Sequence, residues 1–341
     1  MVAAVLVKHG RGEKAFEIKE VPDPVLSPGC VKIKVEAFGL NFADVMARLG
    51  LYQDCPPLPT VIGYDVVGIV TDTAQDVSTF SKGDRVVALT RFGGYAQYAV
   101  ADERACARLS PHYDATKATA LSTQYCTAWY CLEELTCFHE HDSILVHAAA
   151  GGLGIALVQL ALHKKLNVYA TAGSKEKIAF LTNMGVAGAI DYKKQDYAKE
   201  IKRISGRQAP LDACFNSIGG KMVGKDIRLL RPGGREVLLG IAQMSSASLI
   251  GKIGIALQFG FYHPFEFMTT SRSLMGVNML KIADNNPAMI GHCLNQVVQL
   301  AQEKKVDPHI GGSFSIQDLS KAHTLLENRG SMGKIAVYWD K

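Results

Sequence analysis

A glycine-rich turn between a strand and a helix is the feature that most constrains the fold of this chain. Residues 143–146 read Ser-Ile-Leu-Val, as a buried strand does, and they lead into the small-residue run His147–Gly154. A predicted helix, Leu153–Lys164, follows, and a second strand-like run begins at Val168. Small residues in such a turn let the backbone approach a pyrophosphate, and the N–H groups at the start of the helix face the anion.

This turn opens a regular alternation of strands and helices. Further strands are predicted at residues 189–191, 212–216, 236–240 and 274–277, and the helices between them at about 175–184, 197–204 and 222–230. Such alternation predicts a parallel sheet with helices on both faces. The alternative is that the glycine turn only packs a helix against the sheet, but the strands that follow it favour a nucleotide site.

The rest of the chain predicts a second domain. Short strand-like runs separated by turns occur before residue 120, at residues 31–38, 66–71, 85–89, 96–100 and 104–108. Many short strands indicate a closed or nearly closed β-barrel. The last 60 residues do not continue the βα series, so they are expected to return to the barrel. We therefore predict a barrel domain of residues 1–123 and 279–341, with a dinucleotide-binding domain of residues 124–278 inserted into it.

The end of the second strand indicates which dinucleotide binds. An NAD site needs an acidic residue there, whereas this chain has Gly173, Ser174 and the cations Lys175 and Lys177. A hydroxyl and ammonium groups bind a 2′-phosphate, so NADP(H) is favoured, and Tyr192 after the third strand is placed to close over it. The alternative is a solvated first helical turn, but cations there oppose the helix dipole.

Composition limits the other function classes. The eight cysteines are never two residues apart, so zinc-ribbon and redox-dithiol spacings are absent, and reduced thiols in the cytoplasm are expected. The net charge of +5 is spread along the chain, which does not support nucleic-acid binding. The apolar segment Ser248–Tyr262 is interrupted by Lys252 and is shorter than the roughly 20 residues of a spanning helix, so no transmembrane segment is expected.

Taken together, these motifs resemble the medium-chain dehydrogenase/reductase superfamily, and specifically its zinc-free quinone oxidoreductase (zeta-crystallin-like) family. The resemblance covers essentially the whole chain. It is carried by the strings at residues 39–44, 50–52, 59–65, 83–86, 147–154 and 232–234. The longer strings Asn41–Arg48 and Gly50–Pro59 are most similar to the vesicle amine transport protein-like branch. The resemblance implies an α/β fold in which a Rossmann doubly wound parallel sheet is inserted into a GroES-like β-barrel domain.

The resemblance also implies that zinc is absent. Zinc alcohol dehydrogenases of the superfamily have Cys where this chain has Asn41, His where it has Tyr64, and a third ligand, Cys, where it has Thr123. Zinc takes thiolate, imidazole or carboxylate ligands, so this set does not suit it. Without that Lewis acid, alcohol oxidation is disfavoured. Hydride transfer from NADPH to an electrophilic acceptor, a quinone or an α,β-unsaturated carbonyl, is expected instead.

The resemblance implies where the reaction takes place. Asn41 is expected beside the nicotinamide ribose, Tyr52 on the wall of the cleft and Thr127 under the nicotinamide ring. Many family members have Tyr where this chain has Met46, and the change favours a bulky apolar acceptor. Lys334 is expected either to reach the cofactor phosphates or only to begin the last strand. With the residues derived above, the expected cofactor contacts are Asn41, Thr127, Ala150, Gly151, Gly152, Leu153, Gly173, Ser174, Lys177, Tyr192, Asn216, Ser217, Leu239, Gly240, Gly276, Val277, Asn278 and Lys334.

Two other functions stay open beside an NADPH-dependent reductase of quinones or enones. A trans-enoyl thioester reductase should carry a basic patch for its carrier phosphate near the cleft. A catalytically weak NADPH-binding protein would act through protein or membrane-surface contacts, and Met46 and the Ser248–Tyr262 segment favour it. A homodimer is also expected, because the family pairs the edge strands of two Rossmann sheets and Leu274–Val277 is an apolar edge.

Overall fold

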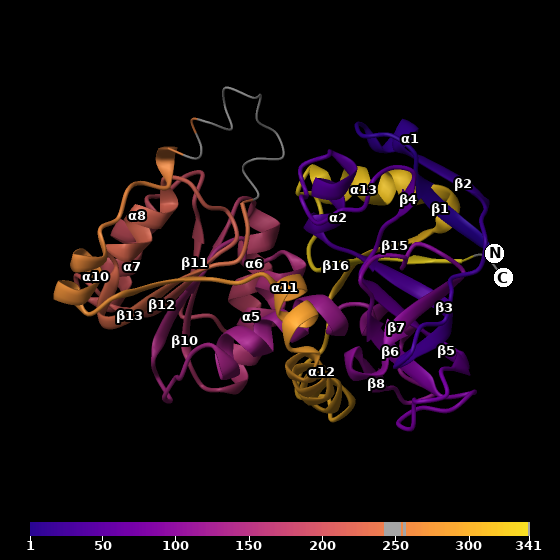
Figure 1. Ribbon diagram of the computed structural model, residues 1–341. Helices are drawn as coiled ribbons and strands as arrows, with labels where there is room; N and C mark the ends of the chain where they lie inside the picture. The colour runs from indigo at the N-terminus through magenta and orange to yellow at the C-terminus, as the bar shows by residue number, and fades with distance from the viewer. Residues whose placement is uncertain (242–253, 255–256, 340–341) are drawn as a thin grey trace. The chain divides into compact units, whose positions relative to one another are not determined.

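The computed structural model describes residues 1–241, 254 and 257–339, and the chain divides into two compact units (Figure 1). One unit consists of Met1–Thr127 together with Met279–Lys341, and the other consists of Ala128–Asn278. The second unit is therefore an insertion in the sequence of the first.

The inserted unit is built on a six-stranded sheet in which every neighbouring pair is parallel. The strand order is β11-β10-β9-β12-β13-β14, the doubly wound order of dinucleotide-binding domains. The predicted Rossmann sheet is thus confirmed. Its strands are β9 (Ser143–Val146), β10 (Asn167–Ala172), β11 (Gly188–Asp191), β12 (Leu211–Asn216), β13 (Leu230–Leu238) and β14 (Ser273–Gly276).

Helices cover both faces of this sheet, as Figure 1 shows with α5 and α6 on one side and α7 and α8 on the other. The helical segments of the unit are η3 (Tyr130–Glu134, a π-helical turn), α5 (Gly152–His163), α6 (Lys175–Asn183), α7 (Tyr197–Ser205), α8 (Met222–Ile227) and α10 (Pro264–Thr270). One buried cluster joins sheet and helices through side chains such as Leu145, Ile190 and Ile201. Strand β13 begins at Leu230, six residues earlier than predicted, and a register shift opposite Leu211 and Ala213 accommodates the extra length.

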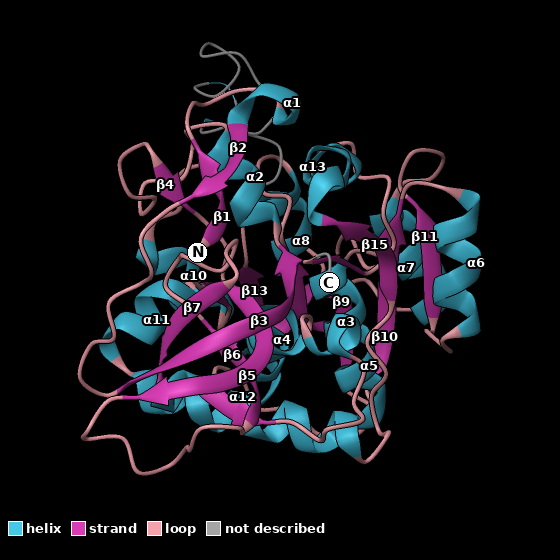
Figure 2. Ribbon diagram, turned by 90° about the vertical axis from the view of Figure 1, so that its right-hand side faces the viewer, coloured by secondary structure: helices cyan, strands magenta, loops and turns pink. Residues whose placement is uncertain are grey.

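The other unit holds a seven-stranded sheet and a small three-stranded sheet (Figure 2). In the large sheet the order is β15-β16-β3-β5-β6-β8, and β7 also pairs with β3. The last strand, β16, pairs antiparallel with β3, so the C-terminal segment belongs to this seven-stranded sheet. The strands are β1 (Val2–Leu6), β2 (Phe16–Glu20), β3 (Cys30–Leu40), β4 (Thr60–Val61), β5 (Asp65–Thr73), β6 (Arg85–Leu89), β7 (Tyr98–Asp102), β8 (Cys106–Arg108), β15 (Ile310–Ser315) and β16 (Lys334–Tyr338).

Short helices and turns surround these sheets. They are α1 (Gly12–Ala15), α2 (Phe42–Arg48), η1 (Glu103–Ala105), α3 (Ala115–Ala118), η2 (Leu121–Tyr125, a π-helical turn), α4 (Cys126–Trp129), α11 (Met279–Asn285), α12 (Pro287–Gln302), η5 (Ile316–Asp318) and α13 (Leu319–Glu327). Residues 114–134 have few turn-forming residues and so predict one helix, but the structure shows that this helix is not continuous. Asp114 caps its first turn, and π-helical turns, which mark functional positions in many helices, interrupt the rest.

The predicted apolar segment Ser248–Tyr262 falls mostly outside the described residues. At its described end, the side chains of Leu257 and Phe261 are exposed. Within the described ranges, no helix is long and apolar enough to cross a membrane. The eight cysteines all lie in the described part of the chain and form no disulfide there.

Candidate functional site

The glycine-rich turn has the backbone of an anion cradle. Ala148 adopts a positive φ of 48°, and Gly151 begins α5 in an extended conformation. A Cβ on Gly154 would overlap the carbonyl of Ala148 and lie 2.7 Å from the carbonyl carbon of Ala149, so α5 can approach the turn this closely only with glycine there. The N–H groups of the first turn of a helix lack helical acceptors and bind anions well. The turn therefore has the geometry for a pyrophosphate.

Directly behind the turn lies a buried polar network centred on Asp226 of α8. The ring of His147 contacts Thr171 Oγ1 through Nδ1 at 2.9 Å and Asp226 Oδ2 through Nε2 at 3.0 Å. The hydroxyl of Tyr197 donates to the other carboxylate oxygen at 2.6 Å, and the amide of Asn216 donates to Oδ2 at 2.9 Å. This network ties the ends of β9, β10 and β12 to α7 and α8, and so fixes the sheet edge that carries the turn.

Asn216 has a structural role that sequence reasoning missed. Its side chain is fully buried, and its Oδ1 accepts hydrogen bonds from the N–H groups of Ile218 and Gly219, both at 2.9 Å. Its amide nitrogen also donates to Glu236, whose pKa is raised by burial and by the nearby Asp226 carboxylate. The Asn216 side chain therefore shapes the turn after β12, and its contact with the cofactor stays a prediction.

The end of β10 gathers the groups predicted to hold a 2′-phosphate. Ser174 caps α6 and accepts from the N–H of Lys177 at 3.3 Å. A Cβ on Gly173 would lie 2.9 Å from the hydroxyl oxygen of Tyr192 and 3.1 Å from Cε of Lys193, so both side chains lie against this glycine. Partial burial and the nearby charge of Lys193 lower the pKa of Lys177. Lys193 was missed, although its position directly after Tyr192 is a readable signal.

The remaining predicted cofactor residues of the inserted unit lie at the same edge of the sheet. The N–H of Leu239 donates to the carbonyl of Asn216 at 2.9 Å, and the N–H of Val277 donates to the carbonyl of Leu238 at 3.0 Å. Residues 216–217, 239–240 and 276–278 therefore follow three neighbouring strands at their carboxyl ends. Ligands of doubly wound sheets bind at this edge.

A second group of predicted residues lies in the other unit, around Asn41. Asn41 follows β3 as the N-cap of α2, and its backbone N–H donates to Asp44 Oδ2 at 2.7 Å. Its side-chain nitrogen donates to Asp65 Oδ2 at 2.5 Å, and its Oδ1 accepts from the ammonium of Lys334 at 2.9 Å. Gln124 lies farther from the same oxygen, at 3.4 Å. The Asn41 amide is therefore held from both ends.

Asp65, at the start of β5, is the centre of this group, which we call the Asn41 cluster (Asn41, Asp65, Ser122, Thr123, Gln124 and Lys334). Its Oδ1 accepts from the hydroxyls of Ser122, at 2.7 Å, and Thr123. Its Oδ2 forms an ion pair with Lys334, and neither side chain is exposed at all. Lys334 begins the last strand, β16, which is one of the two alternatives predicted from the sequence, and its ammonium is buried against Asp65.

The Asn41 cluster does not suit a zinc ion. It contains two of the positions where zinc-containing relatives have ligands, residues 41 and 123, and they lie on either side of Asp65. These positions hold an amide and a hydroxyl, and Lys334 already neutralises the carboxylate. Across residues 1–241, 254 and 257–339, no group of three or more His, Cys, Asp or Glu side chains is arranged to hold a metal. The donor set lacks the thiolates and imidazoles that zinc binds.

The other two predicted catalytic residues, Thr127 and Tyr52, belong to the same unit as this cluster. The hydroxyl of Thr127 donates to the carbonyl of Thr123 at 2.6 Å, which joins Thr127 to the cluster through the backbone. Tyr52 is half-buried and meets the ring of Tyr64 edge-on, with 6.3 Å between centroids, and the ring of Phe92 also packs against Tyr64, with 5.1 Å between centroids. Burial raises the pKa of Tyr52, so its phenol stays protonated near neutral pH.

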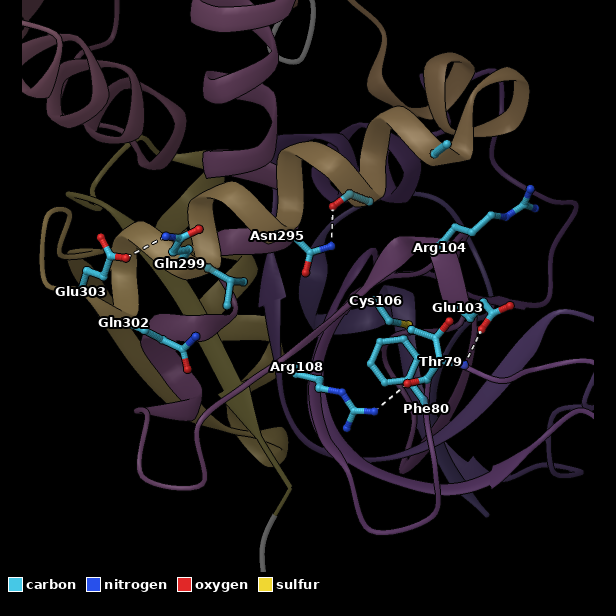
Figure 3. Close-up of a pocket in the computed structure, with 13 residues that line it drawn as sticks. Thr79, Phe80, Glu103, Arg104, Cys106, Arg108, Asn295, Gln299, Gln302 and Glu303 are labelled. Carbon is cyan, nitrogen blue, oxygen red and sulfur yellow. Dashed lines mark hydrogen bonds between the residues drawn. The ribbon is translucent and has the colours of Figure 1, made fainter.

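A groove of about 730 Å³ elsewhere in this unit is not the candidate site. It lies between α12 and the segments around Phe80 and Arg104, and none of the residues predicted from the sequence lines it (Figure 3). Its polar side chains bond to their own neighbours: Arg108 donates to the carbonyl of Thr79 at 2.6 Å, and Asn295 donates to that of Gly291 at 2.8 Å.

Comparisons with known proteins agree with both units. The family model described as "Alcohol dehydrogenase GroES-like domain" matches residues 27–111, and that described as "Zinc-binding dehydrogenase" matches residues 152–302. The "Synaptic vesicle membrane protein VAT-1 homolog" of Danio rerio is 31% identical over 98% of this chain and 69% of its own length. The human "Quinone oxidoreductase" is 28% identical over 99% of this chain and 98% of its own length.

A solved structure has the same fold. The quinone oxidoreductase of Escherichia coli, solved in complex with NADPH, aligns with a TM-score of 0.86 at 22% identity, and the alignment covers 99% of this chain and all of that one.

Proposed function

The chain belongs to the zinc-free quinone oxidoreductase branch of the medium-chain dehydrogenase/reductase superfamily, the branch that includes VAT-1 proteins, and we propose that it is an NADPH-dependent, zinc-independent reductase. Its acceptor in this proposal is a quinone or an α,β-unsaturated carbonyl. The reaction is a two-electron reduction in which the acceptor gains a hydride and a proton.

The observation that carries the proposal is the group of side chains at the end of β10. Ser174, Lys177 and Lys193 surround Gly173 where an NAD-binding relative would need a carboxylate. Burial and the charge of Lys193 both lower the pKa of Lys177, so an anion bound between the two ammonium groups would stabilise their charged forms. A 2′-phosphate has the charge and the acceptor oxygens for this position, so the residues present fit NADPH.

The chemistry follows from what the Asn41 cluster lacks. The cofactor supplies the hydride when it is bound. The residues of this cluster do not form a ligand set for a metal that would stabilise an alkoxide, so in this proposal the acceptor is already electrophilic. In the proposed complex Asn41 contacts the oxygen that gains negative charge, because its amide nitrogen has a second proton beyond the one given to Asp65. The proton that completes the reduction comes from solvent.

A panel of acceptors with both nicotinamide cofactors tests this proposal. Quinones, enones and an enoyl thioester are each mixed with the protein and NADPH or NADH, and the loss of cofactor absorbance is followed. Reduction of quinones or enones with NADPH preferred is the expected result. Tight NADPH binding without reduction of any acceptor would show a binding protein, and selective reduction of the thioester would show an enoyl reductase.

Lysine variants test the cofactor assignment within the same experiment. Lys177→Met and Lys193→Met should each weaken NADPH binding about tenfold, because each removes a charge-assisted hydrogen bond, and should change NADH binding little. Lys199→Met, which removes an exposed lysine of α7, is the matched control and should change neither. Equal weakening of NADPH and NADH binding would contradict the 2′-phosphate assignment.

Two further parts of the proposal concern assembly and location. We propose a homodimer that joins two inserted units through β14, and we propose that the protein acts in the cytoplasm, where its cysteines would stay reduced. Light scattering of the purified protein tests the first, and fractionation of cells expressing the chain tests the second.

A further inference from the structure

We propose that Lys334 is a positioning residue that acts through Asn41: its buried ammonium group orients and polarises the Asn41 amide, and so strengthens the hydrogen bond that this amide gives to the acceptor oxygen. The inference rests on the proposed function and adds a residue to its mechanism. In effect, a lysine cation supplies through an amide the positive field that a metal ion supplies directly in zinc-containing relatives.

The first step of the argument is the orientation of the Asn41 side chain. An asparagine amide offers an oxygen acceptor and two N–H donors. The oxygen accepts from Lys334 at 2.9 Å, and one N–H donates to Asp65 at 2.5 Å. An ammonium has only donors and a carboxylate only acceptors, so the pair fixes which end of the amide is nitrogen. The second N–H is the group left to give to a substrate.

The second step concerns the strength of that donor. Drawing electron density toward the amide oxygen makes the N–H groups of the same amide better donors, and hydrogen bonds in a chain strengthen one another in this way. Both charges lie fully out of water, where solvent does not screen them. The negative charge of Asp65 is shared with other donors: besides Asn41 and Lys334, it accepts from Ser122 and Thr123. The field of Lys334 at Asn41 is therefore only partly cancelled.

The third step is that the fold makes room for this ammonium. Lys334 begins β16, and its side chain passes over Gly39 of β3. A Cβ on Gly39 would overlap Cε of Lys334 and lie 2.8 Å from its Nζ and 3.0 Å from Cβ of Thr119. Gly39 has no positive φ, so space, not backbone conformation, is what its missing side chain provides.

A double-mutant cycle with Lys334→Met and Asn41→Ala tests the proposal. Single-turnover rates are measured with a weakly electrophilic enone and with a quinone, at saturating NADPH. Removing one oxyanion donor costs about 100- to 1,000-fold in other enzymes. Weakening one by removing the charge behind it should slow enone reduction about 10- to 100-fold, and quinone reduction much less. In the Asn41→Ala background, Lys334→Met should add no further acceptor-dependent loss.

A binding measurement tests the polarisation of the Asn41 amide without requiring any turnover. The probe is p-nitrophenolate, whose charged oxygen resembles that of the reduced acceptor and whose visible absorbance reports hydrogen bonding. Its affinity for the complex with NADP⁺ should fall in Lys334→Met by a factor similar to the enone rate, while the affinity for NADPH stays within about twofold. An unchanged phenolate affinity would overturn the proposal.

Two other variants keep the test decisive if Lys334→Met folds poorly. Gly39→Ala keeps every charge but displaces the ammonium from Asn41, so it should lower enone reduction and phenolate affinity in the same pattern. Arg48→Met is the matched control, because Arg48 is the other fully buried cation among the described residues and is paired with Glu327, outside the Asn41 cluster. It should lower thermal stability without changing the enone-to-quinone rate ratio.

The outcomes are distinguishable from failure of the proposed function. If the unmodified protein reduces neither acceptor, the proposed function is wrong, and phenolate binding still tests the polarising role. If it reduces both, but Lys334→Met slows enone and quinone equally, or slows them further in the Asn41→Ala background, Lys334 only stabilises the fold and the inference is wrong.

Discussion

Two buried titratable residues lie on contacting helices, Asp44 on α2 and His323 on α13. Burial raises the pKa of Asp44 from 3.8 to about 7, and burial together with the charge of Arg48 lowers the pKa of His323 from 6.5 to about 3. The hydroxyl of Tyr95 contacts His323 Nε2 at 3.2 Å, and its pKa is raised by burial and by the Asp44 charge. Both Asp44 and His323 therefore favour their neutral forms in the folded protein.

The two shifts have opposite effects on stability. The folded state holds the proton of Asp44 that the unfolded chain loses above its pKa, so this contribution is full below about pH 4 and is lost as the pH rises through 7. Below about pH 6.5 the unfolded chain binds a proton at His323, whereas the folded state keeps this histidine neutral. The contribution of His323 to stability is therefore lost as the pH falls toward 3. Between pH 4 and 6.5 the two contributions compensate.

Single substitutions should therefore expose opposite pH dependences. Relative to the unmodified protein, Asp44→Asn should lose about 3 kcal/mol of unfolding free energy as the pH falls from 6.5 to 4, because only His323 then titrates. His323→Gln should lose a similar amount over the same range as the pH rises. Urea unfolding at several pH values measures both. Parallel pH profiles for both variants and the unmodified protein would contradict the pKa shifts.

At the scale of an element, different glycines of the turn at the start of α5 should affect folding and cofactor binding. Gly154 lies where a Cβ would overlap the backbone of Ala148 and Ala149, whereas a Cβ on Gly151 would meet only the Ala148 carbonyl, at 3.2 Å. Gly154→Ala should cost more than about 2 kcal/mol of unfolding free energy, because backbone cannot move aside as a side chain can.

Gly151→Ala is the matched comparison for this prediction. Its φ of −77° is open to alanine, so the unfolding free energy should change little. Its methyl group would instead occupy the space through which a pyrophosphate approaches, so NADPH binding should weaken. Denaturant unfolding and fluorescence titration with NADPH measure the two effects. A stability loss in Gly151→Ala as large as that in Gly154→Ala would show that the turn is limited by packing alone.

Elements differ in how far the sequence predicts them. The strands and helices of the inserted unit are predictable because their pattern repeats locally and each residue faces the core or solvent at a regular period. The Asn41 cluster is not predictable in this way. Asp65 and Lys334 are 269 residues apart, and no local pattern indicates that they pair. The π-helical turn that brings Ser122 and Thr123 to Asp65 also has no sequence signal of its own.

The individual site residues also differ in whether a local sequence pattern predicts them. Gly151, Ser174 and Lys177 lie in the local strand–turn–helix patterns that define their roles, and the sequence alone predicts them. The sequence around Lys334 leaves both a ligand contact and the start of a strand open, because the partners that bury its ammonium, Asn41 and Asp65, are 293 and 269 residues away. A polar residue's partners, and not its neighbours in sequence, decide whether it binds a ligand or supports the fold.

At the scale of the whole molecule, strand β14 lies at the edge of the inserted sheet, where a strand of another chain can pair with it. Among the described residues, strand β14 pairs only with β13, and an open strand edge pairs readily with another strand. The helix before it, α10, exposes Phe265 and Met268 to 60% and 70%, and Leu274 on β14 itself is 36% exposed. Apolar side chains gathered beside an open edge are typical of a contact surface.

A proline at this edge should separate the proposed dimer without unfolding the inserted unit. The N–H of Val277 donates to β13, so by alternation the N–H of Leu274 faces the open edge. Leu274→Pro removes that donor and leaves the pairing with β13, so light scattering should report a monomer with unchanged NADPH binding. Leu274→Val keeps the donor and should stay dimeric. A dimer that persists in Leu274→Pro would place the contact elsewhere, and an unmodified protein of monomer mass would show that the chain leaves this edge unpaired.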